Sequence, residues 1–217
     1  MVVALIAGNV PLRIAHEIGA PIARTFSDVA AAATAGANTT RVSVNSSGAA
    51  GTSDSRSFTQ NMSSDGRYVV FASSSANFPG ANGQPQIYLR DRTAGTTTLV
   101  SVNQGGTVAA NGGSSDPQIT SDGRFVEFTS CATDLVAGDT NGFCDAFVRD
   151  LQTSTTVAAS VGSGGFANNH VLAAHIAAGG GYVVFETNAT NLVGDNYRGV
   201  FLRNLTTSTT TRVSHDS

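Results

Sequence analysis

The sequence predicts an all-β protein, and more narrowly a β-propeller-like array of three clear four-stranded antiparallel blades. The first observation is compositional, because Val, Thr, Phe and Tyr occur in short runs while the helix-favouring Leu and Glu are scarce. The second is the 24 glycines among 217 residues, many of them in turns between those runs. The third is a segment that recurs three times at a constant spacing of 57 residues. Repeated four-stranded units of roughly 40–60 residues are typical of propeller blades.

Each copy of the repeat carries two motifs in a constant order. The first is a turn pair, followed two positions later by an aromatic residue that begins a short apolar strand. Its three turn pairs are Asp65-Gly66, Asp122-Gly123 and Gly179-Gly180. The second motif is an aromatic residue followed, after one intervening position, by Arg-Asp or Arg-Asn. Its three pairs are Arg90-Asp91, Arg149-Asp150 and Arg203-Asn204.

Four short strands are expected in each unit. The Asp-Gly pairs predict tight turns between the first two strands, since Gly tolerates positive φ and Asp bonds its own following backbone. The second strand, residues 68–71 in the first unit, is apolar at successive positions and is therefore expected to be covered on both faces. The fourth strand, within residues 96–102, alternates Thr or Ser with apolar residues and reads as a half-exposed outer strand.

These motifs divide the chain into an N-terminal segment, residues 1–38, and a repeat domain, residues 39–217. The three blades are expected at about residues 45–102, 103–161 and 162–214. The N-terminal segment is expected to form either a degenerate fourth blade or a partly helical cap, and its short apolar opening is a poor secretory signal. Three blades alone would leave open edges, so this segment or a second chain is expected to complete the ring.

The two motifs together, Ser-x-Asp-Gly-Arg-aromatic-Val-x-Phe and then aromatic-x-Arg-Asp, resemble the TolB-like (WD-repeat-like) β-propeller repeats of bacterial envelope and secreted proteins. The resemblance covers residues 39–214 and is specific for fold rather than for activity. It implies an extracytoplasmic bacterial protein that interacts with other proteins.

The chain has two cysteines, Cys131 and Cys144, which fall at the ends of adjacent antiparallel strands of the middle blade. Their side chains are expected to meet at the mouth of the connecting loop and to form a structural disulfide. The alternative is a pair of buried free thiols. A disulfide would indicate an oxidising, extracytoplasmic compartment.

Within that loop, Asp139, Asn141 and Asp145 place acidic and amide oxygens around a glycine turn. Such oxygens on a flexible backbone suit Ca²⁺, the only cofactor that the sequence suggests. The plainer interpretation is an Asn-Gly turn with a capping Asp.

The turn and Arg-Asp residues recur in successive repeats, whereas an active site is normally built once. We interpret them as scaffold residues that form inter-strand or inter-blade ion pairs and turn caps. They are Asp65, Gly66, Asp122, Gly123, Arg90, Asp91, Arg149 and Asp150.

Ionisable residues that break the repeat are the weak catalytic candidates: His175, Glu127 and Asp134. His175 is expected on an innermost strand, facing the central channel. Glu127 stands where the other blades have Val, so it is expected to be a buried carboxylate paired with Arg124 or Arg149.

Three functions remain open. The first is a non-enzymatic extracytoplasmic binding or scaffold module for a protein or glycan partner. The second is a propeller-hosted polysaccharide hydrolase or lyase, and the third is a structural subunit that closes a ring or forms a filament as a homo-oligomer. The low charge content of 12% and the net charge of −3 argue against a nucleic-acid partner, and no apolar stretch approaches the ~20 residues of a membrane span.

Overall fold

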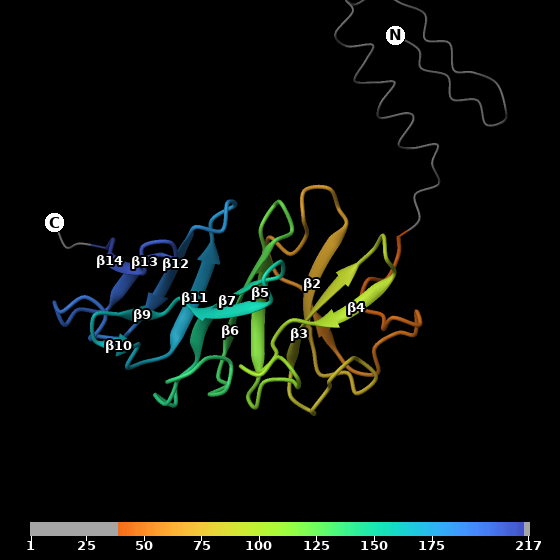
Figure 1. Ribbon diagram of the computed structural model, residues 1–217, viewed down its shortest axis with the longest axis horizontal. Helices are drawn as coiled ribbons and strands as arrows, with labels where there is room; N and C mark the ends of the chain where they lie inside the picture. Colours follow the sequence, from red (N-terminus) through yellow and green to blue (C-terminus); the bar gives the residue numbers. More distant parts are fainter. Residues whose placement is uncertain (1–38, 215–217) are drawn as a thin grey trace, which may run out of the picture. The chain divides into compact units, whose positions relative to one another are not determined.

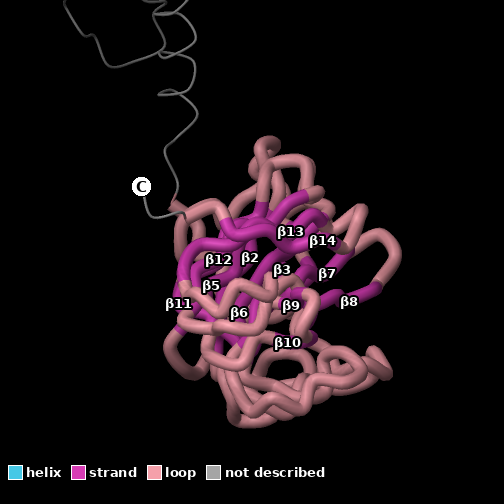
Figure 2. The backbone as a smooth tube through the Cα atoms, turned by 90° about the vertical axis from the view of Figure 1, so that its left-hand side faces the viewer, coloured by secondary structure: helices cyan, strands magenta, loops and turns pink. Residues whose placement is uncertain are grey.

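The computed structural model describes residues 39–214 and contains three four-stranded antiparallel sheets, each in sequential strand order. Figure 1 shows them side by side along the chain, and Figure 2 shows strands and loops but no helix in this part. The first blade is β1 (Ser55–Arg56), β2 (Tyr68–Ser73), β3 (Gln86–Asp91) and β4 (Thr96–Leu99). The second is β5 (Ser114–Ile119), β6 (Phe125–Ser130), β7 (Asp145–Asp150) and β8 (Thr155–Ala158). The third is β11 (Val171–Ile176), β12 (Tyr182–Thr187), β13 (Gly199–Asn204) and β14 (Thr209–Arg212), preceded by the ribbon β9 (Val161–Gly162) and β10 (Gly165–Phe166).

The all-β, propeller-like prediction is confirmed by these sheets. The second and third strands of every blade pair over six residues in the same register, so that the repeat in sequence becomes a repeat in space. Strand β2 is buried from Val69 to Ser73, as its apolar character on both faces predicts, while the outer strands β4, β8 and β14 alternate exposed with more buried positions. The first blade differs in having a first strand of only two residues. The expected fourth blade or cap, residues 1–38, lies outside the described residues.

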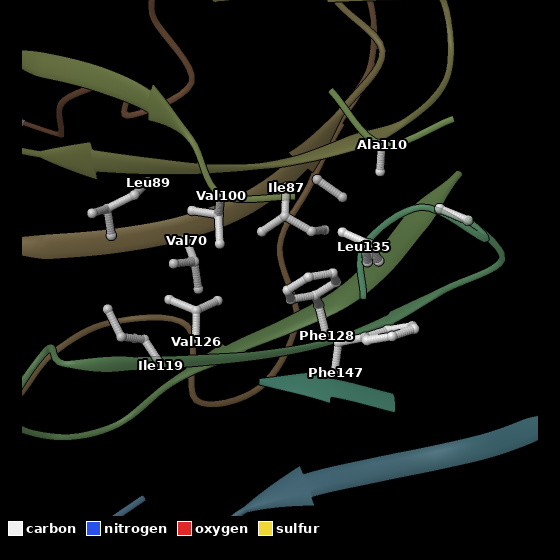
Figure 3. Packing of buried hydrophobic residues seen from close by; sticks show 12 residues of the cluster. Val70, Ile87, Leu89, Val100, Ala110, Ile119, Val126, Phe128, Leu135 and Phe147 are labelled. Atoms are coloured by element: carbon white, nitrogen blue, oxygen red, sulfur yellow. The ribbon is translucent and has the colours of Figure 1, made fainter. Parts of the chain in front are cut away.

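The core consists of layers between neighbouring blades. Val70 and Ile87 of the first blade pack against Val126, Phe128 and Phe147 of the second (Figure 3). The opposite face of the second blade packs in the same way against the third. The sheet of the middle blade is therefore buried on both faces, and each Å² of apolar surface removed from water contributes about 25 cal/mol to stability.

Turn glycines contribute a second, unexpected contact between blades. The aromatic ring of Tyr68 lies against Gly123 in the Asp-Gly turn of the next blade, where an added Cβ would come within 2.5 Å of the ring. Phe125 lies in the same way against Gly180 of the third blade. The equivalent aromatic of the third blade, Tyr182, is 46% exposed. The turn pair therefore has two roles: its glycine allows the tight turn of the hairpin, and it leaves room for the aromatic ring of the preceding blade.

Candidate functional site

The recurring charged residues form the same ion pair in the first two blades. Arg67 of the turn donates to Asp91 at the end of β3 (2.7 Å), and Arg124 donates to Asp150 at the end of β7 (2.7 Å). The Arg67 guanidinium lowers the pKa of Asp91 from 3.8 to about 2, and Arg124 lowers that of Asp150 to about 2. In the third blade Asn204 stands in place of this aspartate. Its side-chain oxygen still accepts the backbone N–H groups of the following turn, but it forms no ion pair.

Adjacent Arg and Asp residues of the second motif have separate roles, because neighbouring strand positions point to opposite faces. Arg90 and Arg149 each donate across the sheet to a threonine hydroxyl of the outer strand, Thr97 and Thr156. Asp91 also accepts the backbone N–H groups two and three residues later.

The turn aspartates act within their own hairpins. Asp65 accepts the Ser63 hydroxyl (2.6 Å) and the Arg67 backbone N–H, and Asp122 makes the equivalent bonds to Thr120 and Arg124. These hydrogen bonds lower the pKa of both carboxyl groups.

Asp134 also proves to be a repeat residue. Its carboxylate accepts the backbone N–H of Asn111 (2.9 Å). Asn191 makes the same bond to Asn168 in the third blade, and Asn77 makes it to Thr52 in the first. Asp134 therefore differs from His175 and Glu127, because it ties two loops of its own blade together as Asn77 and Asn191 do in theirs.

The innermost strands of the three blades, β1, β5 and β11, line one open groove of about 1130 Å³. Its exposed apolar side chains include Phe58 and Leu172, which are 36% and 58% exposed. Arg56 adds a positive charge, and Asp54 and Asp116 add negative charges. This groove occupies the place of the central channel that the sequence analysis expects, and it mixes apolar and charged surface as binding sites do.

His175 lies on β11 and lines this groove, with its Nδ1 2.7 Å from the Gln118 side-chain nitrogen on β5. His170, five residues earlier, lines the same groove and accepts the Cys144 backbone N–H at its Nδ1 (2.9 Å). A regular strand would send these two histidines to opposite faces. The bulge between Val171 and Ala173 breaks that alternation.

Glu127 is the chemically exceptional residue behind the groove. It is 1% exposed, and neither of its carboxylate oxygens has a hydrogen-bond partner. Burial, and secondly the charge of Asp116, raise its pKa well above 4.5. The expected pairing with Arg124 or Arg149 is wrong, because these side chains are directed to Asp150 and Thr156 instead.

Gln118 and Asp116 were missed in the sequence. Gln118 lies directly across the sheet from Glu127 and reaches the third blade by donating to the Ala174 carbonyl (2.7 Å). Asp116 has a φ of 53° within a bulge of β5, a conformation that non-glycine residues rarely adopt. The one available signal was Pro117 inside an otherwise strand-like segment, since proline in a strand often marks a bulge.

The predicted disulfide between Cys131 and Cys144 is present, and both residues border the groove. It closes the loop that holds Asp139 and Asn141. Asp139 of this loop is 3% exposed, and Asp145, the first residue of β7, is fully buried. No three His, Cys, Asp or Glu side chains among residues 39–214 gather as a metal cluster.

The sheets and the groove define the class of this protein as propeller-like and all-β. No family model and no curated protein matches the sequence. Among solved structures, TolB from Acinetobacter baumannii is 15% identical with a TM-score of 0.46, over 76% of this chain and 33% of that one. A putative TolB from Agrobacterium tumefaciens is 16% identical with a TM-score of 0.44, over 69% of this chain and 46% of that one.

A third similar structure is the β-propeller domain of the Trilobed protease from Pyrococcus furiosus, 11% identical with a TM-score of 0.43, over 68% of this chain and 38% of that one. The chain therefore spans between a third and a half of the length of these proteins. Among residues 39–214, the structure has no helix that is long and apolar enough to cross a membrane.

Proposed function

We propose that this protein is a non-enzymatic, extracytoplasmic binding module that holds a protein or glycan partner in the groove between its innermost strands. The observation that carries the proposal is the convergence of β1, β5 and β11 on one groove with exposed Leu172 and Phe58 beside charged side chains. Apolar anchors next to a few polar groups are typical of recognition surfaces. The disulfide supports an oxidising compartment.

Two features support the proposal that the groove binds a ligand, because both reduce the stability of the fold. The buried Glu127 and the strained Asp116 both cost free energy of folding, and both lie at or directly behind the groove. Such costs are concentrated at functional sites.

The test compares two equivalent changes on the surface. Leu172→Arg alters the groove, whereas Val157→Arg alters an aliphatic side chain of similar exposure on the outer strand β8. Each purified variant is immobilised and challenged with bacterial envelope extracts and with a glycan array. We expect a partner that the parent and V157R retain and L172R loses. Equal retention by all three proteins would contradict the proposal.

A specific observation also favours self-assembly through the last blade. Tyr182, the counterpart of the aromatics that pack on the next blade's turn glycine, is exposed, and Val184 and Leu202 beside it are half-buried. This face is where a following blade would dock. We propose that the first blade of a second copy covers it, so that two chains close one ring.

Light scattering on the purified chain tests this second candidate. The parent is expected to be a dimer, and Tyr182→Asp a monomer with unchanged circular dichroism. A monomeric parent at high concentration would exclude assembly of the chain with itself.

A further inference from the structure

We propose that the loop from Asp139 to Asp145 in the second blade binds one Ca²⁺ ion through the carboxylates of these two residues. This site is separate from the groove, and it does not depend on what the groove binds. The Cys131–Cys144 disulfide closes the loop, so one part of the site is held in place covalently.

Asp139 carries the first part of the argument. Its side chain is buried at 3% exposure, and neither carboxylate oxygen has a hydrogen-bond partner within the described residues. A buried carboxylate without a partner is strongly unfavourable.

Asp145 is the second carboxylate. It is fully buried, and its two oxygens accept the Ser160 hydroxyl (2.5 Å) and the Asn141 side-chain amide (2.6 Å). Asp139 lies in the loop that leads into β7, of which Asp145 is the first residue. Among residues 39–214, neither carboxylate forms an ion pair with Arg or His. Two buried acidic groups, one in this loop and one at the start of β7, therefore lack a positively charged partner among residues 39–214.

The first blade shows what occupies the same place when no acid is present. Gln86 corresponds to Asp145, and its amide nitrogen donates to the side chain of Asn82 and to the carbonyls of Ala110 and Gly112 at 3.0–3.3 Å. Its oxygen accepts the Ser101 hydroxyl, as Asp145 accepts that of Ser160. Gln86 is thus satisfied as a neutral donor and acceptor.

The second blade keeps this arrangement of acceptors but loses the donor. Asn141 and the Ala167 carbonyl correspond to Asn82 and the Ala110 carbonyl, and they remain hydrogen-bonded to one another. Asp145 replaces the amide nitrogen with a carboxylate, and Asp139 adds a second one. A bound cation would give these oxygens the partner that the Gln86 amide nitrogen gives the acceptors of the first blade.

The donor set indicates Ca²⁺ among the common cations. All the groups are oxygens, on an irregular loop with a glycine at positive φ at its centre, and two carboxylates balance a divalent charge. The absence of thiolate or imidazole from this set disfavours Zn²⁺. Mg²⁺ demands near-ideal octahedral geometry and gives up its water reluctantly, so a loop of this kind binds it more weakly.

Isothermal titration calorimetry and thermal unfolding, with CaCl₂ or MgCl₂ added to the metal-free full chain, test the site. We expect Ca²⁺ to bind with Kd about 10⁻⁴–10⁻³ M, the range of extracellular modules. At ten times Kd, Ca²⁺ is expected to raise Tm by about 3 °C. Mg²⁺ at the same concentration should have a clearly smaller effect.

Three variants show whether this loop is the site of Ca²⁺ binding. Asp139→Asn and Asp145→Gln, the second of which copies the first blade, should each abolish the Ca²⁺ response while folding normally, since both remove a buried charge. Asp134→Asn is the matched control, because it removes one acidic charge from the same blade and keeps the hydrogen bond that Asn191 makes in the third. No binding to the parent up to about 10 mM Ca²⁺, well above that range, would overturn the proposal, as would an undiminished response in D139N.

Discussion

The first and second blades are built from the same repeat, yet three replacements give the second blade chemistry that the first lacks. Val70, Gln86 and Ser74 of the first blade correspond to Glu127, Asp145 and Cys131 of the second. Strand register, ion pair and turn hydrogen bonds are unchanged between the two blades. The shared residues thus specify the sheet, and the three replacements introduce a buried acid, a candidate cation ligand and a covalent cross-link into a frame that folds without them.

The disulfide is expected to give the largest difference in stability between the two blades. Cys131→Ser combined with Cys144→Ser gives the second blade an unlinked loop like that of the first. The free energy of unfolding should fall by about 3 kcal/mol, because the cross-link no longer restricts a loop of this length in the unfolded chain. Urea denaturation of the parent and the double variant measures this loss, and equal midpoints would show that the bridge contributes nothing.

Glu127→Val makes the second blade copy Val70 and Val184. We expect stabilisation of about 2 kcal/mol at neutral pH, since the carboxyl group is buried without a partner. Its pKa is raised in the folded state, so its cost is absent below the ordinary value of 4.5 and grows as the pH rises above it. The increase in the free energy of unfolding that E127V produces should therefore become smaller as the pH falls. Urea titrations at several pH values test this, and a gain that does not change with pH would contradict it.

The turn glycines give a direct comparison of the two hairpins. Gly123 and Gly66 both have positive φ, but an added methyl at Gly123 meets the Tyr68 ring, whereas at Gly66 the nearest atom is the flexible end of Arg92 at 3.5 Å. Gly66→Ala should cost about 1 kcal/mol from backbone strain alone, and Gly123→Ala about 2 kcal/mol or more. Thermal unfolding of the two variants should rank them in this order, and the reverse order would exclude the proposed packing between blades.

The smallest expected effect concerns the ion pairs that the two blades share. Both aspartates have a pKa lowered to about 2 by Arg, so the stability they provide is complete above 3.8 and is lost as the pH falls toward 2. Asp91→Asn together with Asp150→Asn keeps the turn caps, as Asn204 does, and removes the ion pairs. Acid unfolding of this variant should depend less on pH than that of the parent, and an identical acid profile would show that the pairs are energetically neutral.

The fold could be predicted from the sequence because its determinants are local and repeated. Turn pairs, aromatic strands and Thr-rich outer strands recur at one spacing, and the cysteine positions follow from the strand order. The site was harder to predict, because its geometry depends on bulges. A bulge in β11 changes the alternation between His170 and His175, and another strains Asp116.

The pairing of Glu127 could not be predicted for a related reason. Arg124 lies close to Glu127 in sequence, and Arg149 lies on the paired strand β7, but strand alternation and the ion pair with Asp150 direct both side chains elsewhere. The hydrogen bond that Asp134 shares with Asn77 and Asn191 was also hard to predict, because these equivalent residues differ from it in charge.

The contact between an aromatic ring and the turn glycine of the following sheet has an evolutionary consequence. Both partners belong to the repeated segment, so duplication of one segment produces a new ring together with a new glycine to receive it. Gene duplication can therefore lengthen or shorten such an array without a new interface having to arise by mutation.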